Sequence, residues 1–410
     1  MIVHVFLKNK LISLDSIIPF CMQLHEKCGV EFNFIIFDKV SYETIINNNI
    51  VFGDLIARLG KITNLGSNGY KHKYIRKLYS ILFLLRVWIR SIFMGDILLH
   101  FGLLDEKIFK GFARFIKRKK IILVESNSNG RYEQEFKNAI LRSDNIDYYQ
   151  FRLKNSNIKL TERQKSKYMR AGRLLGFDKE WNYFKHPNAH QSKKIIYSHP
   201  EKSSAWVDFL VNNSENYIAK EINEVKVKNK IVVFILGHIG HQNDERKELH
   251  FKKNFIDTLV AITTIIPENK IFIKPHAYAD IELIERYISD ANKVSEGNIN
   301  YVITKLHPMV LASSAIFSVF NNNSTVIKEY FDVKLPVIQY IKAIPSDMII
   351  DYLSPYPNFV IKDSFLDFLN AINEIMEDDS NYSQRFFTKF DYKFNCDNVS
   401  VIPQKLIPKN

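Results

Sequence analysis

Short apolar runs bounded by polar residues alternate with longer amphipathic stretches along most of the chain. In the first half, the strand-like runs cover residues 1–7, 32–37, 96–101 and 120–125. The helical patterns cover residues 13–26, 42–59, 74–93 and 106–118. Apolar runs of this length that alternate with helices are typical of buried strands in a parallel sheet. The first half therefore predicts a Rossmann-like α/β domain.

The second half repeats the alternation. Its strand-like runs cover residues 230–237, 270–274, 301–303, 315–320 and 335–340. Its helical patterns cover residues 252–265, 281–291, 307–314, 324–331 and 364–376. Residues 134–204, between the two series, are polar and weakly periodic, and we expect them to hold helices and the passage between two domains.

The length agrees with two domains, because 410 residues exceed what one hydrophobic core usually serves. We predict domains at residues 1–190 and 191–375 and a tail at 376–410. Two Rossmann-like halves of this size resemble the GT-B architecture of glycosyltransferases, in which two such domains face each other across a cleft. The resemblance implies that the donor nucleotide lies mostly on the second domain, that the acceptor approaches from the first, and that the tail crosses back.

Part of the net charge of +13 is concentrated between Lys71 and Lys120, where about 13 lysines and arginines stand against three acidic residues. Within this segment, residues 74–93 predict a helix with a broad apolar surface bracketed by cations. Such a helix suits an anionic membrane surface, with Trp88 and Phe93 in the interface and Arg86 and Arg90 among the headgroups. It equally suits a core-facing helix whose basic residues are solvated. The chain lacks a helix-turn-helix, zinc-finger or aromatic-rich RNA motif, so we do not expect a nucleic-acid partner.

The remaining composition predicts a cytoplasmic protein, peripheral to the inner membrane. Three cysteines match neither a disulfide framework nor a zinc signature, and the first apolar run is too short for a signal peptide. No window reaches the length of about 18 uncharged apolar residues that a membrane-spanning helix needs. The histidines at 238, 241 and 250 lack a carboxylate or cysteine at a matching spacing, so we predict no metal site and no cofactor.

Polar residues follow three of the predicted strands of the second half, where open α/β sheets bind their ligands. These candidate binding residues are Gly237, His238, Gly240, Lys274, His276, Asn323, Ser324, Thr325 and Glu329. The glycines permit close approach of the backbone to a phosphate or sugar, although a strand-ending turn explains them as well. Ser324 and Thr325 at a helix start suit a phosphate, where an ordinary helix cap is the alternative. Glu329 lies about one turn deeper, within reach of a ribose.

Lys274 and His276 flank a proline and can neutralise the phosphate of a departing nucleotide. A histidine–proline element followed by a Ser/Thr pair resembles the bacterial GT-B sialyltransferases and related enzymes that use CMP-activated 2-keto sugars, including Kdo and pseudaminic acid. The resemblance implies that His276, Ser324 and Thr325 contact the CMP phosphate. The order here is Pro275–His276, whereas literal His-Pro pairs occur at His199 and His307.

The same family carries an acidic motif ending in glycine in its first domain, which supplies the general base. This chain has no clean copy, because Asp105 and Glu106 are not followed by glycine. Glu125 ends a predicted buried strand in a polar loop, where a base that accepts the proton of an acceptor hydroxyl would stand. We therefore predict Glu125 as the catalytic base and Asp105 as its alternative. An exposed strand-end residue explains Glu125 as well.

The sequence thus predicts a metal-independent GT-B glycosyltransferase of surface polysaccharide synthesis, making O-antigen, capsule or lipooligosaccharide. It would transfer a sugar from a nucleotide-sugar donor, CMP-linked by the resemblance, to a glycan or lipid-linked acceptor. One alternative is a GT-B transferase that uses a UDP- or dTDP-sugar, or a CDP-polyol phosphotransferase. Another is a non-catalytic scaffold at the membrane, which the missing acidic motif favours.

Overall fold

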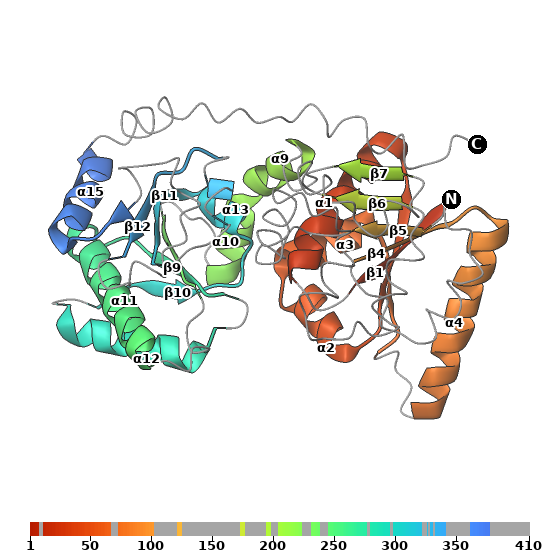
Figure 1. Ribbon diagram of the computed structural model, residues 1–410, viewed down its shortest axis with the longest axis horizontal. Coiled ribbons are helices and arrows are strands. Elements are labelled where there is room, and N and C mark those ends of the chain that lie inside the picture. Colours follow the sequence, from red (N-terminus) through yellow and green to blue (C-terminus); the bar gives the residue numbers. More distant parts are fainter. Residues whose placement is uncertain are drawn as a thin grey trace, which may run out of the picture. The chain divides into compact units, whose positions relative to one another are not determined.

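Figure 1 shows the computed structural model of the chain. The structure describes residues 1–7, 11–66, 73–101, 121–124, 173–176, 194–197, 204–223, 231–237, 245–276, 279–295, 298–321, 326, 329–330, 333–341 and 361–377. The chain divides into two compact units after Val207. The predicted boundary at residue 190 and the tail from residue 378 onwards lie outside the described residues, so both stay predictions.

Unit 1 is built on a parallel sheet with the strand order β3-β2-β1-β4-β5-β6-β7. The strands are β1 (Ile2–Leu7), β2 (Glu31–Ile36), β3 (Gly60–Asn64), β4 (Ile97–Phe101), β5 (Ile121–Val124), β6 (Arg173–Gly176) and β7 (Lys194–Tyr197). The order of the first four reverses between β1 and β4, as it does in Rossmann folds. Strands β6 and β7 lie within residues 134–204, a stretch for which the sequence analysis predicted helices and the passage between domains but named no strand.

The helices of unit 1 connect its early strands. They are α1 (Leu11–Cys28), α2 (Lys39–Tyr42), a π-helical segment (Glu43–Asn47), α3 (Ile50–Leu59) and α4 (Lys73–Phe93), and the division between the units falls inside α9 (Ser204–Asn212). Asn49 begins α3 by accepting a hydrogen bond from the backbone N–H of Phe52 at 3.1 Å. Within unit 1, the ring of Phe52 stacks on that of Trp206, with 6.2 Å between ring centroids.

Gly53 of α3 lies against the backbone of the π-helical segment. A Cβ atom at this position would collide with the carbonyl oxygen of Ile46, which is backbone and cannot swing away. We expect Gly53→Ala to lower the free energy of unfolding by about 1–3 kcal/mol through overpacking, measured by urea denaturation. The same substitution usually stabilises a helix interior, so an increase in stability would contradict the close contact.

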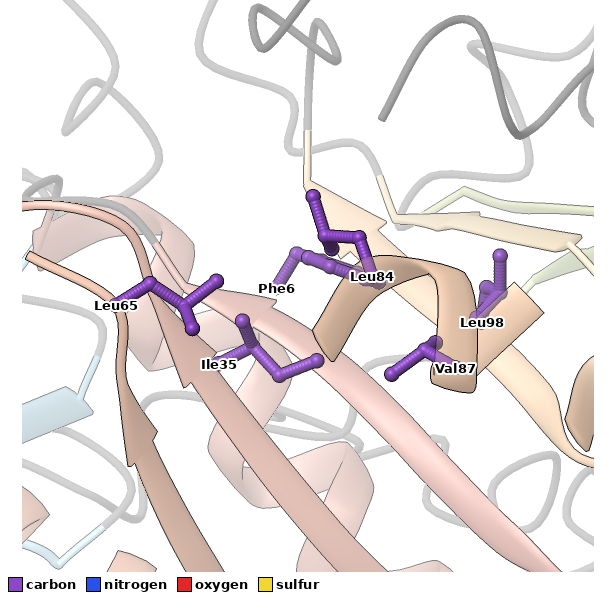
Figure 2. Packing of buried hydrophobic residues seen from close by; sticks show 6 residues of the cluster. All are labelled: Phe6, Ile35, Leu65, Leu84, Val87 and Leu98. Carbon is purple, nitrogen blue, oxygen red and sulfur yellow. The ribbon is translucent and has the colours of Figure 1, made fainter. Parts of the chain in front are cut away.

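Helix α4 packs one of its faces on the sheet of unit 1. Leu84 and Val87 are buried against Phe6, Ile35 and Leu98, as Figure 2 shows. The helix ends at Phe93, and Gly95 follows with a φ of 80°, a conformation that favours glycine and turns the chain towards β4. In Figure 1, α4 (orange) runs along one side of unit 1.

A buried polar network fixes the end of α4 to the first strand. Asp96, which is 0% exposed, accepts hydrogen bonds from the backbone N–H of Ile2 at 2.8 Å and from Nε of Arg90 at 2.7 Å, and it bonds Nε2 of His4 at 3.2 Å. Nδ1 of His4 lies 3.3 Å from Nδ2 of Asn33 on β2. Three elements, α4, β1 and β2, are therefore joined by one chain of polar side chains.

Unit 2 contains a second parallel sheet, with the strand order β10-β9-β8-β11-β12-β13. The strands are β8 (Ile231–Ile235), β9 (Ile271–Lys274), β10 (Tyr301–Ile303), β11 (Ala315–Phe320), β12 (Val337–Tyr340) and β13 (Ile361–Lys362). This is the Rossmann order, with its reversal between β8 and β11. The predicted Rossmann-like second half is confirmed.

Among the residues that the structure describes, the helices of unit 2 are α10 (Ser214–Ile222), α11 (Glu245–Ile265), α12 (Ile281–Val294), α13 (Pro308–Ala312) and α15 (Phe365–Glu377). Aromatic contacts join helices to the sheet. Phe255 of α11 contacts Phe234 of β8 with 5.3 Å between ring centroids, and Phe368 of α15 stacks on Tyr340 of β12 at 4.6 Å. The first of these contacts packs α11 on β8, whose end carries part of the candidate site.

Candidate functional site

The candidate site lies at the carboxyl ends of the central strands of unit 2. The strand register pairs Lys274 of β9 with Ile235 of β8, and Ile235 with Phe320 of β11. Parallel strands lie about 4.8 Å apart, so residues just beyond this row share one edge of the sheet. The edge brings together Lys274 at the end of β9, His276 after it, Gly237 after β8, and Asn321 after β11.

This edge includes the point where the strand order reverses. The reversal falls between β8 and β11, so Gly237 and Asn321 flank it, and β9 adjoins β8 on the other side. Open α/β sheets bind ligands in the crevice outside the carboxyl ends of the strands at such a reversal. Gly237 is buried and leaves no side chain between the end of β8 and a ligand.

The turn after β9 holds Lys274 and His276 in defined positions. Both residues are half-buried, and Pro275 lies between them. The backbone N–H of Ala279 donates to the carbonyl oxygen of His276 at 2.9 Å, which closes the turn. Asp280 then begins α12 by accepting from the backbone N–H of Leu283 at 3.1 Å. The strand before and the helix after therefore fix both ends of this cationic turn.

Asn321 directly follows β11 and was not among the predicted binding residues. It is 0% exposed, yet neither its amide nitrogen nor its amide oxygen has a hydrogen-bond partner within the described part of the chain. A buried polar group left unpaired costs about 1–3 kcal/mol, so such groups call for an explanation. A ligand at the strand reversal, with complementary donors and acceptors, would provide the missing partners. The run of three asparagines after an apolar strand was the signal in the sequence.

Tyr330 adds a second buried polar group close to the end of β11. Its ring meets that of Phe320, the residue before Asn321, edge to face with 5.5 Å between centroids. Its hydroxyl is buried and has no hydrogen-bond partner among the described residues. Burial, and then the nearby charge of Glu329, raise the pKa of this hydroxyl, so it remains protonated and able to donate.

Of the remaining predicted site residues, Glu329 lies within the described part of the chain. Glu329 is half-buried in a helical turn, where its backbone N–H donates to the carbonyl of Val326 at 3.0 Å. Outside the described residues lie Asp105, Glu125, His238, Gly240, Asn323, Ser324 and Thr325. Their roles stay predictions.

His307, which is followed directly by a proline, has a structural role. It is buried, and its Nδ1 accepts a hydrogen bond from the backbone N–H of Met309 at 3.2 Å, which begins α13. Pro308 follows as the first residue of the helix, a favoured position for proline. His307 therefore caps a helix, whereas His276 lies at the carboxyl edge of the sheet.

Among the described residues, no group of three or more histidine, cysteine, aspartate and glutamate side chains is arranged to hold a metal ion. The absence of a metal requirement stays a prediction.

Several solved structures resemble this chain over nearly its whole length. UDP-GlcNAc 2-epimerase from Neisseria meningitidis bound to UDP-GlcNAc superposes with a TM-score of 0.57 at 10% identity, covering 99% of this chain and 98% of that one. UDP-GlcNAc 2-epimerase from Methanocaldococcus jannaschii gives 0.52 at 14% identity, covering 91% and 92%. The wall teichoic acid polymerase TagF gives 0.50 at 12% identity, covering 99% and 88%. No protein-family model and no curated protein sequence matches the chain.

At these identities the likeness concerns the fold. It agrees with the strand orders of both sheets, each of which has the Rossmann reversal. The chain has the fold predicted from its sequence, an α/β fold of the GT-B type with two Rossmann-like units.

Proposed function

We propose that this chain is a GT-B glycosyltransferase that transfers a sugar from a UDP-activated donor to a glycan or lipid-linked acceptor. The observation that carries the proposal is the edge of the second sheet, where Gly237, Lys274, His276 and Asn321 gather around the strand reversal. The likeness to the enzyme bound to UDP-GlcNAc, which covers 99% of this chain, supports UDP as the nucleotide. This donor was an alternative in the sequence analysis, where the motif resemblance favoured CMP.

The basic side chains at this sheet edge suit the negative charge that develops on UDP during sugar transfer. As the bond between the anomeric carbon and the phosphate oxygen of UDP breaks, the bonding electrons stay on UDP as negative charge. Lys274 and His276 would neutralise that charge, which is greater in the transition state than in the ground state. The acceptor hydroxyl oxygen forms the new bond to the anomeric carbon and gives its proton to a base, for which Glu125, with Asp105 as alternative, remains the predicted residue.

An epimerase that acts on a UDP-sugar is the second candidate function, because two of the structural neighbours are UDP-GlcNAc 2-epimerases. Net charge favours the transferase. A protein with a net charge of +13 concentrates anionic polymers and lipid-linked pyrophosphates near its surface, which an enzyme acting on one small soluble molecule does not need. Incubation with UDP-GlcNAc alone separates the two functions, since an epimerase converts the sugar without an acceptor.

Calorimetric titration of the purified chain with UDP, CMP and dTDP tests the proposal. We expect UDP to bind more tightly than CMP or dTDP. In the variant Asn321→Leu, we expect at least about tenfold weaker UDP binding, corresponding to 1.4 kcal/mol or more. Its thermal stability without ligand should be equal or higher, because an unpartnered buried amide is replaced by an apolar side chain of similar size.

Three other results of this titration and of the stability measurement would each change the proposal. Tight binding of CMP alone would replace the UDP donor by a CMP-activated 2-keto sugar. Binding of none of the three nucleotides would overturn the transferase proposal in favour of the scaffold. Loss of thermal stability in Asn321→Leu together with unchanged UDP binding would show that Asn321 serves the fold.

A further inference from the structure

Helix α4 has a second apolar face that points away from the core. Besides the buried Leu84 and Val87, it carries apolar side chains that are 44% to 79% exposed, namely Ile75, Leu78, Leu82, Ile89 and Phe93. These five residues are three or four positions apart, except between Leu82 and Ile89, where Arg86 occupies the intermediate position on the stripe. Since a helix turns once in 3.6 residues, they form one continuous stripe, opposite the stripe of Leu84 and Val87.

An exposed stripe of this length is unusual on a surface helix. The helix has 21 residues, which corresponds to about 30 Å, and the stripe runs along most of it. A surface helix of a monomeric protein normally exposes a polar face, and contiguous exposed apolar patches mark interaction sites. The stripe therefore requires a partner that covers it.

The charge around the stripe identifies the kind of partner. Helix α4 contains no aspartate or glutamate. Arg76 bonds the carbonyl of Gly66 at 3.2 Å, and Arg90 is held by Asp96, so these two cations serve unit 1 itself. Lys77 and Arg86 are exposed and have no acidic partner among the described residues. They are available to anions next to the stripe.

We propose that the exposed face of α4 docks on an anionic lipid bilayer. The apolar stripe would enter the boundary between headgroups and acyl chains, and Lys77 and Arg86 would contact anionic headgroups. A second copy of the chain is a poor occupant, because it would bring the same unpaired cations against this face.

The opposite face of α4 sets the geometry of docking. Leu84 and Val87 tie the helix to the sheet, so it can lie on a bilayer and cannot leave unit 1 to cross it. In agreement, no helix within the described residues combines the length and the apolar character that crossing a membrane requires. Docking through α4 does not depend on the proposed transferase function, although it would bring the chain to a lipid-linked acceptor.

Flotation with lipid vesicles, in the absence of nucleotide, tests the proposal on the full chain. We expect binding to vesicles of phosphatidylcholine and phosphatidylglycerol, weaker binding at high salt, and little binding to phosphatidylcholine alone. The double variants Leu78→Ser/Leu82→Ser and Lys77→Glu/Arg86→Glu should each bind about tenfold or more weakly. The matched control Leu249→Ser/Leu366→Ser changes exposed leucines of unit 2 and should bind as the unchanged chain does.

Three results would overturn the proposal. The first is no binding of the unchanged chain to the anionic vesicles. The second is equal binding of Leu78→Ser/Leu82→Ser and the control. The third is a concentration-dependent dimer in size-exclusion chromatography that Leu78→Ser/Leu82→Ser abolishes, which would assign the stripe to a second copy. Nucleotide binding is measured separately, so failure of docking leaves the proposed function standing, and the reverse holds as well.

Discussion

Replacing Asp96 by alanine is expected to lower the free energy of unfolding of unit 1 by about 3–5 kcal/mol, because it removes the buried carboxylate of an ion pair and leaves the buried ring of His4 without its partner. The carboxylate of Asp96 is 0% exposed and binds the backbone N–H of Ile2, the ring of His4 and the guanidinium of Arg90. The variant leaves these three donors without an acceptor. Urea denaturation followed by far-UV circular dichroism measures the loss.

Asp290 provides a matched control for this experiment. It is also an aspartate with two cationic neighbours, Lys252 at 2.6 Å and Lys293 at 2.7 Å, but the pairs lie at the surface. Surface ion pairs contribute little, so Asp290→Ala should leave the urea midpoint nearly unchanged. Equal losses in Asp96→Ala and Asp290→Ala would contradict the importance of the buried network.

The same carboxylate makes stability depend on pH. Burial opposes ionisation of Asp96, but the hydrogen bonds with His4, Ile2 and Arg90 outweigh burial and lower its pKa from 3.8 to about 2. A carboxyl group with a lower pKa in the folded state stabilises the fold above its unfolded pKa. That stability, about 2 kcal/mol, is lost as the pH falls from about 4 to about 2. The acid-induced loss should be smaller in Asp96→Ala, whereas unchanged acid sensitivity would argue against Asp96 as its source.

The parts of the fold that could be predicted from sequence are those in which local pattern and burial agree. Residues 301–303 and 315–320 were predicted as strands with the bounds the structure gives, because apolar runs end there at polar residues. Strands β6 and β7 were missed, since each has four residues and begins with a cation, Arg173 or Lys194. Strand β3 was missed because Gly60–Asn64 is polar and lies at a sheet edge, where little is buried.

The candidate site likewise has a part that could be predicted from the sequence and a part that could not. The strand ends that carry Gly237, Lys274 and His276 could be predicted, because each follows an apolar run. The burial of Asn321 could not, since it depends on which strands flank β11 in the sheet. The network of His4, Asn33 and Asp96 was unpredictable for a similar reason, as it requires the pairing of β1 with both β2 and β4. The hydrophobic pattern therefore could not predict features that depend on contacts between elements distant in sequence.

The second large effect is expected at Lys274, which in the proposed transferase neutralises the departing UDP. Lys274→Ala should lower kcat by about 10²- to 10³-fold and change KM less, because the interaction strengthens as negative charge develops in the transition state. Steady-state turnover of a UDP-sugar measures both constants, and a thermal melt establishes that the variant is folded.

Lys270 is the matched control, because it precedes β9 whereas Lys274 ends it. Both lysines are half-buried, and Lys270 lies about 13 Å away at the amino end of the strand, where the sheet does not bind ligands. We expect Lys270→Ala to change kcat by no more than a few-fold. If the two variants lose activity equally, general electrostatics of a basic protein explains the effect. If only KM rises in Lys274→Ala, the lysine binds substrate and transition state alike, and stabilisation of the leaving group falls to His276 at the same strand edge.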